Sequence, residues 1–448
     1  MCQGHTPVGS GRTVVTVKSK AKSMSLILKK LVVQKVETGD RTGFDQGVLT
    51  IETADLATSL LTADSRLSTV SVHLAHPDDS TRVLCVKDVI QPSLKLDNKG
   101  YGNGSRLILD NMAVVTTGPI VGFQEGIIDM SGRGALYSPF SSMPLVILEL
   151  EVVDDLPPHE HEEALRKAGL LASEYLAEKS QDTHVDSTEE ILWDEIGMDP
   201  SLPNIAYVLM VLSQGLLHDT YVMGQNARQN LPISVDPRVI LDAGIISGNC
   251  VSACDKNTSF HHCNNPVVRE LLNGHGKRWN FTGVVITSQP VRLADKQRSA
   301  AAAVAMVTEL NTQGSIKGAI KSDINGAIIS KEGFGNPDAD LVMILRGLEQ
   351  QGIRTVGITD EFAGADGGSQ SIADTTPEAD AIVSTGNANE KLLLPPMTTT
   401  IGPVPDVARL AGGYAGSLHE DGSLEVELQA IIGATNQLGY GRLSCREI

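Results

Sequence analysis

The second half of this 448-residue chain alternates between strand-like and helical segments. Strand-like apolar runs lie at 281–287, 326–330, 354–359 and 380–384, and helical stretches lie near 294–310, 337–351 and 370–375. Strands that alternate with helices form βαβ units, because parallel strands need long crossover connections. We therefore predict a parallel sheet here, with a last strand over 423–432 as an antiparallel edge.

The first half is rich in short strand signals instead. From Met24 to about Val153, apolar or β-branched runs are separated by Gly, Asp, Pro and Asn turns. These runs are 26–28, 31–33, 48–51, 71–74, 82–86, 107–109 and 145–148. Apolar residues at helical spacing predict a helix over 159–179, and 204–212 reads as a buried strand. The expected fold class is α/β, with a β-rich N-terminal half followed by a parallel-sheet βαβ C-terminal half.

Length and charge exclude several classes of protein. Two domains of about 200 residues each are the better expectation for this length. The 36 Lys and Arg against 54 Asp and Glu give a net charge of -18, and only 4% of residues are aromatic, so a nucleic-acid binder is not expected. No apolar run approaches the roughly 20 residues of a membrane span. Six cysteines are too sparse for a disulfide scaffold, which favours a reducing, cytoplasmic location.

The N-terminal end has a different charge. Residues 1–36 contain seven Lys and Arg and no acidic residue. This composition suits a targeting peptide, but no apolar region precedes Met24, which argues against secretion. We expect residues 1–23 to be a disordered extension or an upstream start, with the folded chain beginning near Met24.

Polar loops follow the predicted parallel strands, where ligands of such sheets bind. The loop 332–338 resembles a phosphate-binding glycine loop, but Asp338 and Asp340 in the first helical turn would repel an anion. Asn336 as N-cap with Pro337 at N1 explains this loop as a plain helix start. Asp360 and Glu361 suit either an acidic pocket for a cationic ammonium group or a solvated loop.

Two sets of residues contain potential metal ligands, but their spacing does not suit a metal site. His159, His161 and Glu163 could ligate a metal together with His218-Asp219, but residues at i and i+2 do not share a helix face. Cys250 and Cys254, followed by His261-His262-Cys263, have neither redox nor zinc spacing. We predict no metal.

Several long motifs of mixed chemistry carry a resemblance to a known family. They are 121–132, 159–163, 215–222, 247–257, 264–266, 331–340, 384–390 and 411–418, and the similarity covers about residues 24–448. The segment 247–257, Ser-Gly-Asn-Cys-Val-Ser-Ala-Cys-Asp-Lys-Asn, is the most informative of them. The chain resembles the component B proprotein of the glycine, sarcosine and betaine reductases. Residues 1–23 and an apparent insertion at 311–325 have no counterpart in the family.

The resemblance implies a precursor that cuts itself between Asn249 and Cys250. The products would be a beta chain, 1 or 24 to 249, and an alpha chain, 250 to 448, whose first residue becomes a pyruvoyl group made from Cys250. Gly248 permits the strained backbone that attack by the thiol requires. A general base must take the thiol and Cα protons. His218, Asp255, His261 and His262 are candidates by residue type.

The family's reaction implies the partners. The pyruvoyl ketone would condense with the amine of glycine or sarcosine as an imine, which activates the C–N bond. A selenolate from a separate selenocysteine-containing component B subunit then displaces the amine, and the carboxymethyl group passes to selenoprotein A. Component C releases acetyl phosphate, and thioredoxin supplies the reducing equivalents. Betaine has a quaternary nitrogen and cannot form an imine, so this mechanism does not account for betaine as a substrate.

Two alternatives to this reductase of amino-acid fermentation stay open. A pyruvoyl-dependent amino-acid decarboxylase would also use Cys250 but needs no selenoprotein. A non-catalytic α/β ligand-binding protein would leave the Asn249-Cys250 bond uncut.

Overall fold

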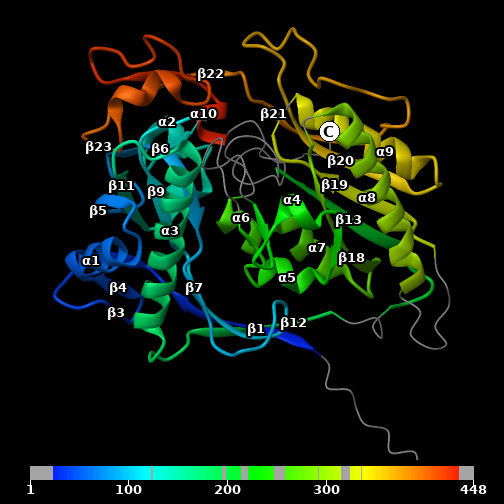
Figure 1. Cartoon of the computed structure of the whole chain (residues 1–448), viewed down its shortest axis with the longest axis horizontal. Coiled ribbons are helices and arrows are strands. Elements are labelled where there is room, and N and C mark those ends of the chain that lie inside the picture. The colour runs from blue at the N-terminus through cyan, green and yellow to red at the C-terminus, as the bar shows by residue number, and fades with distance from the viewer. Residues whose placement is uncertain are drawn as a thin grey trace, which may run out of the picture.

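The computed structural model describes residues 24–122, 125–193, 198–212, 220–246, 258–290, 292–313, 323–333 and 335–432. These residues form two bodies that lie side by side (Figure 1). The first body, blue to teal, contains several sheets and the long helix α3 (Pro158–Ser180), and the second, green to yellow, is built on one six-stranded sheet. No helix among the described residues is both long enough and apolar enough to span a membrane.

The first body is centred on a mixed sheet in the order β10-β6-β9-β11-β5, with β23 beside β6. Its strands are β5 (Leu67–Ala75), β6 (Thr81–Ile90), β9 (Ala113–Thr117), β10 (Gly126–Asp129), β11 (Leu145–Val152) and β23 (Thr399–Ile401). Neighbouring strands run antiparallel except for β11 beside β9 and β23 beside β6. All ten residues of β6 are buried, as expected of a strand covered on both faces.

Two smaller sheets complete the first body. A four-stranded sheet has the order β12-β1-β8-β7, and a three-stranded sheet has the order β2-β4-β3. Their strands are β1 (Ser25–Val32), β2 (Lys35–Thr38), β3 (Gly43–Asp45), β4 (Val48–Ile51), β7 (Ser93–Lys95), β8 (Gly104–Asp110) and β12 (Ser187–Leu192). The short helices here are α1 (Thr53–Ala63), α2 (Gly132–Ala135) and η1 (Pro139–Ser142).

Helix α3 covers one face of the central sheet. It starts with Pro158, a residue that suits the first helical position because its missing N–H would be unpaired there. Ala164, Leu165 and Ala168 face the sheet with no exposed surface. A Cβ atom at Gly169 would lie 2.5 Å from Cδ1 of Ile90, so this glycine lets the helix approach the sheet closely.

The second body is a sheet in the order β16-β18-β13-β19-β20-β21. Its strands are β13 (Asn204–Val211), β16 (Ile233–Val235), β18 (Asn280–Ser288), β19 (Gly326–Ser330), β20 (Arg354–Glu361) and β21 (Ile382–Asn387). All neighbours are parallel except β16, which is the antiparallel edge. Helices α8 (Leu293–Gln313) and α9 (Asn336–Glu349) pack on one face, and α5 (Pro237–Leu241) and α7 (Pro266–Gly274) contribute to the core on the other.

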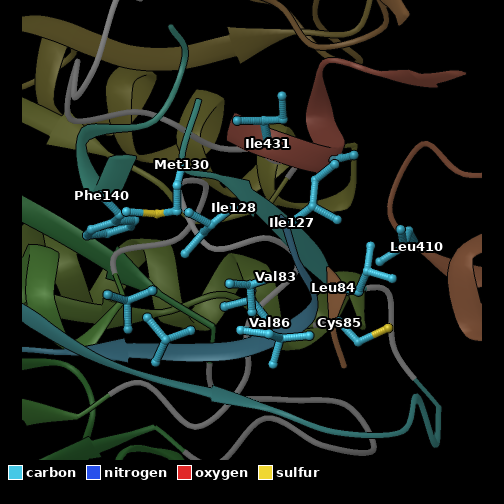
Figure 2. Packing of buried hydrophobic residues seen from close by; sticks show 14 of the residues in the cluster. Val83, Leu84, Cys85, Val86, Ile127, Ile128, Met130, Phe140, Leu410 and Ile431 are labelled. Carbon is cyan, nitrogen blue, oxygen red and sulfur yellow. The ribbon is translucent and has the colours of Figure 1, made fainter. Parts of the chain in front are cut away.

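Short elements connect these layers. They are β14 (Tyr221–Val222), β15 (Gln225–Asn226), β17 (Ile245–Ile246), α4 (Ala227–Asn230), α6 (Ser259–Cys263), β22 (Lys391–Leu394), η3 (Val404–Arg409), β24 (Leu424–Glu427) and α10 (Gln429–Ile432). The last four belong to a C-terminal segment, orange to red in Figure 1, that returns to the first body. Figure 2 shows Leu410 and Ile431 of this segment in one cluster with Leu84 and Ile127.

The α/β class and the parallel sheet of the second body are confirmed. The two bodies nevertheless exchange segments: β13 and β16, from before residue 249, lie in the sheet of the second body, and β22 to α10 pack on the first. Two predictions are wrong. Residues 370–375 are irregular, with the backbone N–H of Ala373 held by Asp338 at 2.9 Å. The predicted strand 423–432 ends at Glu427, pairs with β22, and is followed by α10.

Candidate functional site

The carboxyl ends of the parallel strands lie at one edge of the second body, where a ligand site is expected in such sheets. After β13 the chain leads to α5 and α7 on one face of the sheet, whereas after β19 it enters α9 on the opposite face. In open α/β sheets, ligands bind where connections from neighbouring strands diverge in this way. Leu212 follows β13 at this place, and Lys331 and Glu332 follow β19.

Glu332 and His262 form a buried acid–base pair at this edge. The Nε2 atom of His262 lies 3.4 Å from Oε1 of Glu332, and the two side chains are 0% and 1% exposed. The other carboxylate oxygen accepts a hydrogen bond of 2.6 Å from the backbone N–H of Leu212, which fixes it beside β13. Within the described part of the chain, neither ring nitrogen of His262 makes a hydrogen bond of normal geometry. Buried polar atoms in this state are rare, so the pair is a candidate for function.

Helix α6, which carries His262, lies between the two bodies (Figure 1). Thr258 caps the helix, because its hydroxyl oxygen accepts a hydrogen bond from the N–H of His261. On the side of the first body, Ser259 donates its hydroxyl to Asp88 of β6 at 2.7 Å. The helix is therefore fixed to both bodies, through Asp88 on one side and Glu332 on the other.

His261, the other imidazole of α6, has different surroundings. Its ring stacks on Phe140, with ring centroids 5.1 Å apart and planes inclined by 30°. Burial, with a smaller effect from His262, lowers the pKa of His261 to about 3. This imidazole is therefore neutral at ordinary pH and a weak base.

The two ends of segment 247–257 meet at one cavity. Strand β17, which ends at Ile246, contacts α6, which begins at Ser259. Both residues line a cavity of about 310 Å³ together with Lys95, Arg106 and Cys263. Burial raises the pKa of the Cys263 thiol to about 11, so this cysteine stays protonated. The segment thus starts and ends beside α6.

Two of the four residues predicted to assist cutting, His261 and His262, lie in α6, whereas the other two and the predicted cut lie elsewhere. Asn249, Cys250, Asp255 and His218 lie outside the described residues. Their predicted roles therefore remain predictions.

Asp360, predicted at the end of a strand, is part of a buried charge cluster. It is neither a solvated loop residue nor an open acidic pocket, because Lys331 lies 3.1 Å away and both side chains are at most 1% exposed. Lys331 also contacts Asp338 at 2.9 Å. Burial raises the pKa of Asp360 to about 6, although Lys331 opposes this shift. Burial works against the charge of Lys331, but the two carboxylates raise its pKa, so it remains a cation.

This shift predicts a pH dependence of stability. Because the pKa of Asp360 rises from 3.8 to about 6 on folding, its protonated form stabilises the native state fully below pH 3.8, and this contribution is lost as pH rises through about 6. The free energy of unfolding of the wild type, minus that of Asp360→Asn, should fall between about pH 4 and pH 7. Urea unfolding of both proteins measures the difference, and a constant difference would contradict the prediction.

The structure also places the other residues that were predicted near this edge of the sheet. Glu361 is half-buried and accepts a hydrogen bond from Ser384. Helix α9 starts at Asn336, so its N-cap is Gly335 rather than the predicted Asn336. Asp340 is buried and pairs with Lys296. The first turns of α9 thus hold carboxylates that are paired with buried lysines.

The residues considered as metal ligands point to different partners. His161 lies 3.4 Å from Glu162, and Glu163 instead pairs with Arg66 at 2.7 Å. Glu162 also contacts the buried Lys87 at 2.6 Å. The described residues contain no group of three or more His, Cys, Asp or Glu side chains that could hold a metal ion.

Sequence reasoning did not identify Glu332 or Lys331 as site residues. Their place directly after strand 326–330 is the signal that could have found them, since side chains at this position reach the ligand edge. The pairing of Glu332 with His262 carries no local sequence signal, because the two residues are 70 positions apart.

The chain is similar in sequence to proteins of one known family. The family model described as glycine/sarcosine/betaine reductase component B subunits matches residues 24–446. The glycine reductase complex component B subunits alpha and beta of Peptoclostridium acidaminophilum are 42% identical over 94% of this chain and all of that protein. The sarcosine reductase complex component B subunit alpha of the same organism is also 42% identical, over 94% of this chain and its own full length.

A more distant similarity involves a protein named as a precursor. The D-proline reductase proprotein PrdA of Acetoanaerobium sticklandii is 22% identical over 74% of this chain and 54% of that protein. No solved structure matches the chain.

Proposed function

Because this chain belongs to the family of glycine/sarcosine/betaine reductase component B subunits, we propose that it is a self-processing precursor of a pyruvoyl-containing subunit of such a reductase. The observation that carries the proposal is that Ile246 and Ser259, on either side of segment 247–257, line one cavity, and that the helix beginning at Ser259 also carries His262 of the buried His262–Glu332 pair. The proposed cut at Asn249-Cys250 lies between these two ends. A 42% identical relative whose name covers two subunits, alpha and beta, supports a chain that yields two products.

The proposed cleavage uses only groups of the chain and water. The thiolate of Cys250 attacks the carbonyl carbon of Asn249, the C–S bond forms, the C–N bond breaks, and the nitrogen takes a proton. Loss of the Cα proton then breaks the Cβ–S bond, which leaves an enamine on the second chain and a thiocarboxylate on the first. Water hydrolyses the enamine with release of ammonia, and the thiocarboxylate with release of hydrogen sulfide. No oxidant or reductant is consumed.

The described residues fit a pyruvoyl group placed near α6. His262 and Glu332 are buried, and the two ring nitrogens of His262 and Oε1 of Glu332 lack hydrogen-bond partners of normal geometry within the described chain, so these atoms can bind a small polar group. A terminal pyruvoyl group would supply a ketone that reacts with amines as an electrophile. Around it, α6 would exclude water, because its first four residues are buried.

We assign the reaction class and the partners on the same basis. The substrate would be glycine, sarcosine or betaine, and the product would lead to acetyl phosphate. The sequence contains no selenocysteine, so the selenolate would come from a separate selenocysteine-containing component B subunit, followed by selenoprotein A and component C. Thioredoxin as the reductant and the few cysteines suit the cytoplasm.

Mass spectrometry of the purified chain tests the proposal. We expect two fragments that divide between residues 249 and 250, the second beginning with a pyruvoyl group that reacts with hydrazine reagents. An intact chain, or a second fragment that begins with an ordinary cysteine, would contradict it. Incubation with glycine and the other components should yield acetyl phosphate, whereas release of carbon dioxide would indicate a decarboxylase.

A further inference from the structure

The cavity of about 310 Å³ lies where β6, β7, β8 and α3 of the first body meet β17 and α6. We propose that this cavity binds a small aliphatic carboxylate, which Arg106 and Lys95 hold by charge-assisted hydrogen bonds. The inference goes beyond the proposed function, because it requires neither a cut chain nor a pyruvoyl group.

The two cations of the cavity share one buried carboxylate. Lys95 and Arg106 line the cavity, and both contact Asp242, whose side chain has no exposed surface. Asp242 neutralises one of the two positive charges, so one positive charge remains. Glu174 also lines the cavity, but it is exposed to water, which screens its charge. An excess of one positive charge favours a monovalent anion, such as a carboxylate, over a phosphate dianion.

Unused hydrogen-bond donors accompany this charge. Arg106 donates from Nε to Asp242 Oδ1 at 2.7 Å, from Nη2 to the backbone carbonyl of Asp242 at 3.0 Å, and from Nη1 to Ser93 Oγ at 3.1 Å. These bonds use three of its five N–H groups. Lys95 donates to Asp242 and, at 2.5 Å, to the carbonyl of Asn103, which uses two of its three. Among the described residues, two N–H groups of Arg106 and one of Lys95 are thus available to the oxygens of a carboxylate.

Much of the remaining wall suits a short hydrocarbon chain. Its apolar side chains are Ile90, Leu94, Leu170, Ala243 and Ile245. Ligand sites usually combine such a surface with a few polar groups that fix the orientation of the ligand, and this cavity is at the lower end of their usual volume. The cavity therefore suits a molecule of about the size of an amino acid.

Cys263 lines the same cavity and provides a chemical probe of it. Burial raises the pKa of its thiol to about 11, and the charge of Arg106 opposes this shift, which places the sulfur near Arg106. Iodoacetate carries a carboxylate, and iodoacetamide is its neutral analogue of similar shape. With either reagent, the thiolate sulfur forms a bond to the CH₂ carbon, and iodide leaves with the electron pair of the C–I bond.

The test compares the rates at which the two reagents alkylate Cys263 at about pH 9, measured by mass spectrometry of its peptide. The ratio of the iodoacetate rate to the iodoacetamide rate is divided by the same ratio for glutathione, a free thiol. We expect this relative preference to be at least about 10, the usual effect of hydrogen bonds to a charged group. Without a cationic site, burial would instead disfavour the charged reagent.

Two lysine variants assign the preference to the cavity. Lys95→Gln removes one cation, while Arg106 and the N–H of Gly102 still bind Asp242. It should bring the preference close to that of glutathione. The matched variant is Lys99→Gln, because Lys99 belongs to the same β7–β8 connection, has more than half of its side chain exposed, and is not part of the cavity lining. It should keep the wild-type preference, and circular dichroism checks that both variants fold.

Competition identifies the group that is bound. Acetate should slow the labelling of Cys263 by iodoacetamide, whereas neutral acetamide at the same concentration should not. Acetate has no amine and cannot condense with a ketone, so failure of the proposed function would leave this result unchanged.

Three outcomes would overturn the inference: a preference equal to that of glutathione, equal losses in the two lysine variants, or protection by acetamide as strong as that by acetate. If neither reagent reaches Cys263, calorimetric titration with acetate decides. Binding that Lys95→Gln weakens at least about 10-fold, and Lys99→Gln does not, would support the carboxylate site. Absence of such binding would overturn it.

Discussion

Replacing Cys250 with alanine should leave the chain as one uncut polypeptide, whereas the wild type should be recovered as two fragments. Alanine has no sulfur to attack the Asn249 carbonyl and none to eliminate, so neither the break nor the pyruvoyl group can form. The variant should also show no labelling by a hydrazine reagent. Mass spectrometry under denaturing conditions measures both effects in one sample.

Two other cysteines provide the controls for this experiment. Cys254 lies four residues further along the same segment, and Cys263 belongs to α6. Cys254→Ala and Cys263→Ala should both be cut between residues 249 and 250. Normal cleavage of Cys250→Ala, or loss of cleavage only in Cys254→Ala, would move the processing site elsewhere.

Replacing Lys331 with methionine should lower the free energy of unfolding by about 3–5 kcal/mol, the usual cost of removing one partner of a buried ion pair. Lys331 is fully buried and contacts Asp338 and Asp360, so its loss leaves two buried carboxylates without their cation. Methionine has a similar volume, which limits any effect of a cavity. Urea unfolding followed by circular dichroism measures the change.

The control is a lysine in a solvent-exposed pair. Lys167 lies 3.6 Å from Glu163 one helical turn earlier, with half of its side chain exposed. Lys167→Met should cost less than about 1 kcal/mol, because water screens such pairs. A similar small loss in both variants would show that the Lys331 cluster contributes little to stability.

Segments with a clear period could be predicted from the sequence. The predicted helix over 159–179 is α3, at 158–180, and the predicted strand 326–330 is β19. In both segments the local pattern of apolar residues agrees with their packing. Residues 370–375 were predicted as helical but are held by a contact with Asp338, 35 positions away, which no local pattern contains.

The partners of strands and of buried charges could not be predicted. The run 204–212 reads as a buried strand, but nothing in it says that it pairs with β18 and β19, which come more than 70 residues later. Likewise, the sequence around Glu332 does not indicate whether its side chain faces solvent or His262. Such contacts arise only in the assembled fold. The sequence therefore indicated which types of residue could serve in the candidate site, but not how these residues are arranged.

The exchange of strands between the two bodies favours folding of the intact chain before any cut between residues 249 and 250. Strand β13, from before residue 249, pairs on both edges with strands from after it, and β23 of the later part pairs with β6 of the earlier part. Two separate products would have to find each other with much of their hydrophobic surface exposed. A continuous backbone keeps them at a high effective concentration while these strands pair. The peptide bond between residues 249 and 250 then acts as an assembly tether, and we expect the two halves, when expressed as separate chains, to associate far less efficiently than the intact precursor folds.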